Sequence, residues 1–106
     1  MTDKIVVLTT CESEDEAERI ARSLLEKRVA ACVNILPKAR SIYRWKGAVE
    51  DTQEFVLLIK TRRDVFEALR IELSKAHSYE VPEVMALPVV DGSESYLGWI
   101  DRELAS

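Results

Sequence analysis

The chain has 106 residues, a length that fits one domain, and we expect residues 1–106 to form a single domain. Hydrophobic residues make up 47% and charged residues 32%, which is typical of a soluble globular protein and unlike disordered chains. The net charge of −4, with basic residues scattered among acids, argues against a nucleic-acid or anionic-membrane surface. The longest apolar runs, Ile5–Leu8 and Phe55–Ile59, fall far short of the roughly 20 residues that span a bilayer. Two cysteines and no export-like start favour a cytoplasmic protein.

The first third of the chain predicts a strand followed by a helix. Lys4–Thr10 is a β-branched run that closes at Cys11, which indicates a strand covered on at least one face. Ser13 and Glu16 have the spacing of a capping box, which predicts that a helix of about 14–28 begins here. Apolar residues then recur every three or four positions, which gives this helix one apolar face: Ala17, Ile20, Ala21, Leu24 and Leu25.

The middle of the chain predicts a long β-hairpin. A strand over 31–36 is interrupted by Pro37 and resumes over 41–45. Lys46 and Gly47 then form a turn, and a strand over 49–60 follows.

The last third predicts helix, strand and helix. Asp64 with Glu67 is expected to cap a second helix that ends near His77. Val81–Val90 is expected to be a strand, bounded by Pro82 and Pro88, and 93–104 a short terminal helix.

The order β-α-β-β-α-β predicts an α+β fold of the ferredoxin-like, split β-α-β kind, with a long hairpin between the second and third strands. The first and third strands then lie in the middle of the sheet. All the prolines, Pro37, Pro82 and Pro88, fall in the expected edge strands, where the sheet tolerates them. Because both helices cover one face, the other face needs a cover, and Tyr43 and Trp45 near the hairpin tip favour self-association.

Several candidate ligands converge at the end of the sheet where the first strand and second helix end. They are Cys11, His77, Tyr79, Glu80 and Glu83, and a thiolate, an imidazole and carboxylates suit copper or zinc. The alternative is that Cys11 and Cys32 are two partly buried thiols and that His77 only caps a helix. A nucleophile–base pair of Cys11 and His77 lacks any evident oxyanion donor or orienting third residue, so no catalytic centre is predicted.

The second cysteine, Cys32, opens a strand that runs parallel to the first strand. Cys11 and Cys32 therefore lie at opposite ends of the predicted sheet and should not share one ion within a subunit. A small anionic ligand could instead be held by Arg44 and Lys60, with Tyr79 and Glu83, unless these basic residues are simply solvated.

The chain closely resembles a known family along nearly its whole length. The segments that carry the resemblance are Ala30–Ile35 (AACVNI), Ser41–Gly47 (SIYRWKG), Ile59–Thr61 (IKT), His77–Glu83 (HSYEVPE) and Tyr96–Ile100 (YLGWI). These segments, in this order along the chain, are similar to those of the CutA divalent-cation tolerance proteins.

This resemblance implies a ferredoxin-like subunit in a tight homotrimer, associated with tolerance of copper and other divalent metals. In architecture the family is similar to the trimeric PII signalling proteins, which bind small ligands between subunits. The family's proposed metal ligands are two cysteines and a histidine. Cys32 and His77 match two of them, whereas the first cysteine falls nearer Thr9, with Cys11 as a neighbour. Ser78 replaces the family's usual proline.

The resemblance leads to one leading function and two alternatives. We expect a non-enzymatic homotrimer of metal tolerance and response, with copper or another divalent cation as its candidate ligand. The alternatives are a PII-like sensor of a small anion at the subunit boundary, and a structural trimer that anchors a partner protein.

Overall fold

The computed structural model describes residues 1–105. Its elements follow the predicted order: β1 (Lys4–Cys11), α1 (Glu14–Glu26), β2 (Cys32–Trp45), β3 (Ala48–Arg62), a 3-10 turn (Arg63–Val65), α2 (Phe66–Ala76), β4 (Met85–Pro88) and α3 (Glu94–Glu103). The strands form one antiparallel sheet in the order β2-β3-β1-β4. The predicted α+β fold, with the first and third strands in the middle, is confirmed.

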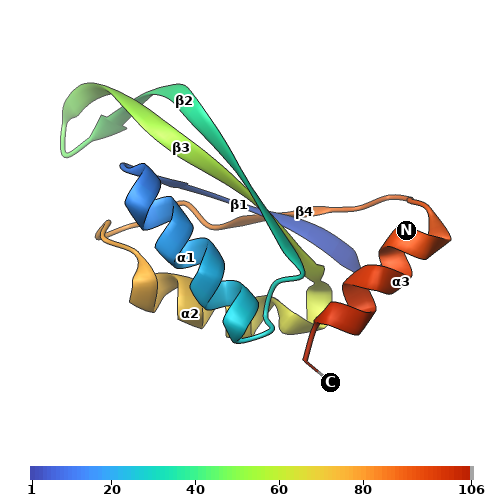
Figure 1. Cartoon of the computed structure of the whole chain (residues 1–106). Coiled ribbons are helices and arrows are strands. Elements are labelled where there is room, and N and C mark those ends of the chain that lie inside the picture. Colours follow the sequence, from blue (N-terminus) through green and yellow to red (C-terminus); the bar gives the residue numbers. More distant parts are fainter. Residues whose placement is uncertain (106) are drawn as a thin grey trace.

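One face of the sheet and two helices enclose the core. Figure 1 shows α1 and α2 on the same side of the sheet. Because successive strand residues point to opposite faces, every second residue of β1 faces the helices and is buried. The largest fully buried apolar side chains of this core are Val7, Ile20, Leu24, Leu57, Ile59, Leu69 and Leu73.

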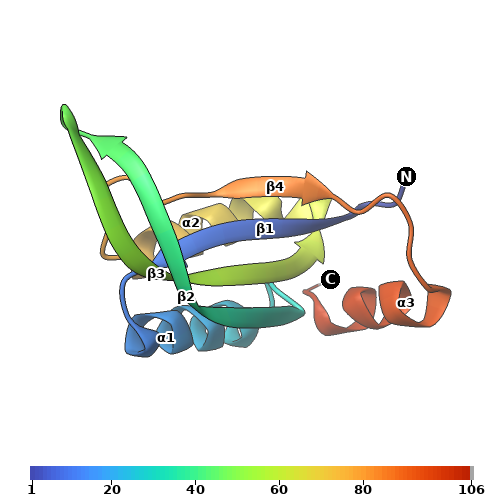
Figure 2. The same cartoon turned by 90° about the horizontal axis from the view of Figure 1, so that it is seen from above.

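The opposite face of the sheet is apolar and uncovered by α1 or α2. Leu8 at its centre pairs with Leu58 of β3 on one side and Met85 of β4 on the other. Leu36, Met85 and Leu87 on the edge strands are 43%, 51% and 48% exposed. Figure 2 shows α3 beyond one end of the strands and not over them. We call this surface the open face, and the prediction that the helices leave it uncovered is confirmed.

The β2-β3 hairpin extends beyond the rest of the sheet (Figure 1). Its two-residue turn has positive φ at Lys46 (49°) and Gly47 (82°), as a type I′ turn requires. The predicted interruption at Pro37 is a bulge between Leu36 and Ala39, and β2 continues through it. An edge strand accommodates this bulge because its outer hydrogen-bonding side has no partner strand to lose within the subunit.

Three predicted boundaries were wrong. α1 ends at Glu26 because Arg28 takes a left-handed conformation with φ of 56°. Asp64 does not cap α2: it lies in the 3-10 turn, and its carboxylate accepts a 2.7 Å hydrogen bond from Arg62. β4 is shorter than Val81–Val90, and Pro82 lies in the loop before it.

The terminal helix α3 is attached to the end of the sheet by apolar and ionic contacts. Ile100 and Leu104 pack with Ala31 in a second, smaller cluster. Asp101 of α3 pairs with Lys4 at 3.3 Å and Arg62 at 3.0 Å, which are partners in neighbouring strands. Within residues 1–105, none of the helices combines the length and apolar character needed to cross a membrane.

Candidate functional site

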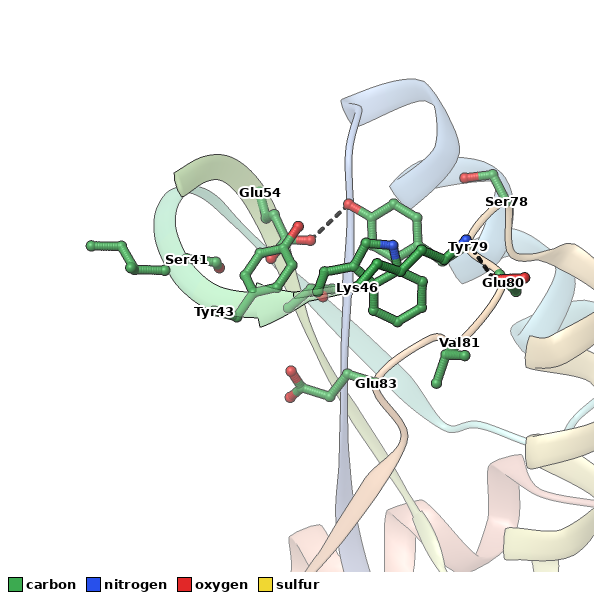
Figure 3. Close-up of a pocket in the computed structure, with 12 residues that line it drawn as sticks. Ser41, Tyr43, Lys46, Glu54, Ser78, Tyr79, Glu80, Val81 and Glu83 are labelled. Atoms are coloured by element: carbon green, nitrogen blue, oxygen red, sulfur yellow. Dashed lines mark hydrogen bonds and ion pairs between the residues drawn. The ribbon is translucent and has the colours of Figure 1, made fainter. Parts of the chain in front are cut away.

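A pocket of about 830 Å³ lies at the hairpin tip, between the hairpin, the end of β1 and the loop that follows α2. Figure 3 shows its residues. The lining combines three aromatic rings, three carboxylates and one ammonium group with smaller side chains: Tyr43, Trp45, Tyr79, Glu54, Glu80, Glu83, Lys46, Thr10, Ser41, Ile42, Ser78 and Val81.

Strand alternation places two of the aromatic rings on the pocket side of the hairpin. Tyr43 and Trp45 are two residues apart on β2 and both line the pocket. Arg44 lies between them, so its side chain leaves the strand on the opposite face, and it is not among the lining residues.

The third ring, Tyr79, joins the α2–β4 loop to the sheet. Its hydroxyl donates a 2.7 Å hydrogen bond to Glu54 of β3, whose side chain is buried (Figure 3). Burial, and then the bond to the Glu54 carboxylate, raise the pKa of Tyr79. The phenol therefore stays protonated and serves as a hydrogen-bond donor at neutral pH.

His77 holds the start of the same loop. Its Nδ1 accepts a 3.0 Å hydrogen bond from the backbone N–H of Tyr79, so the ring proton belongs on Nε2, which lies 2.6 Å from the carbonyl oxygen of Thr10. The side chain is fully buried, and its ring centroid is 4.8 Å from that of Tyr79. His77 thus fixes the loop against β1 and orients Tyr79 toward the pocket.

Glu16 fixes the next residue of the loop. Ser13 accepts from the Glu16 backbone N–H at 3.1 Å, as the predicted capping box requires, but the Glu16 carboxylate accepts from the Ser78 N–H at 2.7 Å. Burial alone would raise the pKa of Glu16, yet the hydrogen bonds from Ser78 prevail and lower it. The charged carboxylate therefore links the start of α1 to the pocket loop.

This linkage predicts a loss of stability in acid. The pKa of Glu16 is lower in the folded chain than its reference value of 4.5. The charged carboxylate therefore contributes to the free energy of unfolding above that pH. This contribution is lost as the pH falls through the lower folded value. We expect Glu16→Gln to reduce the free energy of unfolding at pH 7 by about 1–3 kcal/mol. Urea unfolding of both proteins from pH 7 down to pH 3 should show this difference shrinking below about pH 4.5.

The control for this test is Glu18→Gln. Glu18 is 57% exposed and pairs with Arg22 on the surface of α1, so its replacement should change stability by less than about 1 kcal/mol. A Glu16 effect that persists unchanged at pH 3 would contradict the assignment.

The two cysteines lie far apart, as the topology predicted. Cys11 pairs with Phe55 and Cys32 with Lys60 on the shared neighbour β3, which separates them by about 16 Å along the strands at about 3.3 Å per residue. Cys11 is fully buried, and burial, followed by the charge of Glu16, raises its pKa to about 11. At neutral pH the thiol is protonated and lies beneath the pocket rather than in its lining.

The predicted metal ligands are only partly brought together. Glu80 and Glu83 line the pocket, whereas His77 lies behind Tyr79 with both ring nitrogens in hydrogen bonds. Across residues 1–105 of the single subunit, no group of three or more His, Cys, Asp or Glu side chains is arranged to hold a metal ion. A preformed metal site does not fit this subunit as folded. Metal binding by Cys11, His77, Glu80, Glu83 and Cys32 therefore stays a prediction.

The predicted anion ligands also lie apart in one subunit. Tyr79 and Glu83 line the pocket, but Lys60 contacts Asn34 and lies 4.0 Å from the sulfur of Cys32, toward the other end of the sheet. Arg44 is outside the lining. An anion site that uses these residues remains a prediction that a single subunit does not complete.

Sequence reasoning missed Glu54 and Lys46 as pocket residues. The signal available for Glu54 is its position directly before the apolar run Phe55–Ile59 of a central strand. A buried carboxylate there needs a partner, which the structure provides in Tyr79. Tyr43 and Trp45 are 40% and 38% exposed in the subunit, and their place in a trimer interface stays a prediction.

These features define a ferredoxin-like protein with a ligand-sized pocket at the tip of its long hairpin. The model of the family described as CutA1 divalent ion tolerance protein matches residues 5–103, so the chain belongs to this family.

Relatives agree with this assignment along the whole fold. The divalent-cation tolerance protein CutA of Thermus thermophilus is 48% identical over 95 residues, which cover 90% of this chain and 92% of the relative. The crystal structure of CutA from Xylella fastidiosa superposes with a TM-score of 0.95 at 42% identity, covering 98% of this chain and all of the other. The mouse Protein CutA is 47% identical over 88% of this chain, which spans only 52% of the mouse protein.

Proposed function

We propose that this chain is a non-enzymatic, single-domain subunit of a homotrimer that acts in cytoplasmic tolerance of divalent cations, copper among them. The observation that carries the proposal is the family match over residues 5–103. The Thermus relative is named for divalent-cation tolerance and is similar over 92% of its own length, which supports a shared role.

The open face supports assembly. Leu8, Leu58 and Met85 form an apolar row across three strands, and neither α1 nor α2 covers it. Burying such a surface between subunits is favourable by about 25 cal/mol per Å² of apolar area. The unpaired outer sides of β2 and β4 add backbone donors and acceptors that a neighbouring subunit can satisfy.

Sedimentation equilibrium should therefore give a mass near three subunits that does not change with protein concentration. Trp45→Ala should weaken this trimer by about 3–5 kcal/mol, as truncation of a buried aromatic anchor does. A stable monomer at micromolar concentration would end the trimer proposal. An unchanged melting temperature of the variant would place Trp45 outside the interface.

Direct metal binding is tested by titration of copper and zinc into the wild type and matched variants. The proposed site requires a deprotonated Cys11 and a lone pair on His77, so His77→Ala and Cys11→Ser should each lower the affinity by about tenfold or more. Cys32→Ser should change it little, because Cys32 lies toward the other end of the sheet. Loss only in Cys32→Ser, or no change in any variant, would rule out this site.

A second candidate is a PII-like sensor of a small anionic ligand at the subunit boundary; of its predicted ligands, one subunit brings Tyr79 and Glu83 together. In that case a thermal-shift screen of nucleotides and organic anions should raise the melting temperature where copper and zinc do not. No shift in melting temperature with any of these ligands would favour the third candidate, a structural trimer that anchors a partner protein.

A further inference from the structure

We infer that the pocket at the hairpin tip binds an organic ammonium ion with an apolar body. The aromatic rings of Tyr43, Trp45 and Tyr79 attract cations through their electron-rich faces. The same lining carries three carboxylates, Glu54, Glu80 and Glu83, against the single ammonium group of Lys46. Rings and carboxylates together favour a ligand that is positively charged and partly apolar.

The carboxylates lie at two depths, which suits a ligand that enters with its charged group. Glu54 is 5% exposed and uses one oxygen to accept from Tyr79. A carboxylate offers about four lone-pair positions, so acceptor capacity remains on this buried side chain. Glu80 and Glu83 are exposed and come from the α2–β4 loop (Figure 3), so they contribute negative potential near the entrance.

Lys46 shows how an ammonium group is accommodated. Its Nζ lies 5.5 Å from the centroid of the Trp45 ring and 3.7 Å from a carboxylate oxygen of Glu80. The side chains of Lys46 and Glu80 are 71% and 67% exposed, so this pair is weak and exchanges readily with solvent. A ligand ammonium group can therefore compete with Lys46 for the same ring and carboxylate.

The charge of the lining disfavours the other ligand classes for this pocket. An anion would meet three carboxylates, and the one lysine present is already paired with Glu80. The inference concerns an organic ligand and goes beyond the proposed role in cation tolerance. It does not require a metal site, but it does require that the pocket beside Trp45 stays open to ligand in the native assembly.

Trp45 provides a direct signal for the test. The chain has two tryptophans, so a Trp99→Phe background leaves Trp45 as the single tryptophan reporter in the pocket. The full chain in its native assembly is titrated with benzylammonium, with neutral benzyl alcohol and with benzoate, which differ chiefly in charge. We expect benzylammonium to quench or shift Trp45 emission with a Kd at least about tenfold below those of the other two. Raising the salt concentration should weaken its binding.

Matched variants locate the site. Glu83→Gln at the entrance should weaken benzylammonium binding several-fold, and Glu54→Gln about tenfold, while Lys46→Met, which removes the internal competitor, should tighten it. Glu26→Gln is the control, because Glu26 is exposed at the end of α1, outside the lining, and should leave the Kd unchanged. If Glu54→Gln fails to fold, the benzylammonium affinity of Glu83→Gln tests the site alone.

Three results would overturn the inference: equal binding of the three probes, tighter binding of benzoate, or no response of Trp45 to millimolar benzylammonium. A Kd that Glu83→Gln and Glu26→Gln change equally would also overturn it. None of these outcomes bears on the metal titration, so failure of this inference and failure of the proposed function are distinguishable.

Discussion

Replacing Leu24 with alanine is expected to lower the free energy of unfolding by about 2–5 kcal/mol, the range of leucine truncations in packed cores. Leu24 is fully buried on the face of α1 that packs against the sheet. The truncation removes apolar contacts and leaves a cavity that the central strands and α2 cannot fill by small shifts. Urea unfolding at a single protein concentration measures the loss and keeps any contribution from subunit association constant.

The neighbouring residue provides a control of the same type. The sequence spacing placed Leu25 on the apolar face of α1, but this was wrong: Leu25 is 42% exposed and lies outside the buried face, so Leu25→Ala should cost less than about 1 kcal/mol. Equal losses in the two variants would mean that the buried face of α1 has been assigned incorrectly. The pair also tests the helix periodicity directly, because adjacent residues on a helix point about 100° apart.

Leu58→Asp is expected to disrupt the assembly while the subunit stays folded. Leu58 lies at the centre of the open face, between Leu8 of β1 and Asn34 of β2 in the strand register. If subunits associate through this face, the substitution buries an unpaired carboxylate and should weaken association by at least about 3 kcal/mol per subunit. Sedimentation velocity should then show monomer at micromolar concentration, and circular dichroism should show retained helix and strand.

Ile71→Asp is the matched control for surface charge. Ile71 is 42% exposed on α2, which lies on the opposite side of the sheet from the open face. This variant should keep the mass of the wild type. A trimer that survives Leu58→Asp unchanged would show that the subunits meet elsewhere, for example only through the strand edges or the hairpin tip.

The pocket depends on contacts that join distant parts of the sequence, and this explains why it could be predicted only in part. The sequence placed Tyr79, Glu80 and Glu83 near the end of β1 because the topology brings the end of α2 to that point. It did not reveal that Glu54 meets Tyr79, a contact across 25 positions, or that Glu16 meets Ser78 across 62. Side-chain pairings of this range follow from packing and leave no periodic signal.

Element order, strand order and most of the buried faces follow from local patterns in the sequence. The β-branched run of β1 is a local pattern, and the strand it predicted is confirmed. The three- and four-residue spacing in α1 is local too, and its predicted face is confirmed except at Leu25, which is exposed. The two-residue turn at Lys46 and Gly47 was equally local, because the turn type demands residues that tolerate positive φ.

Where local preferences compete, the outcome depends on contacts that exist only in the folded chain. Asp64 is of a residue type that caps helices, yet its carboxylate pairs with Arg62. Pro37 lies in a bulge at a point where the sequence pattern predicted a break in the strand. The carboxylate of Glu16, buried against the loop, accepts from the Ser78 N–H and not from the N–H of Ser13, as the second half of a capping box would require. For Glu16 the deciding factor is burial, because a buried carboxylate needs a hydrogen-bond donor and burial is a property of the whole fold.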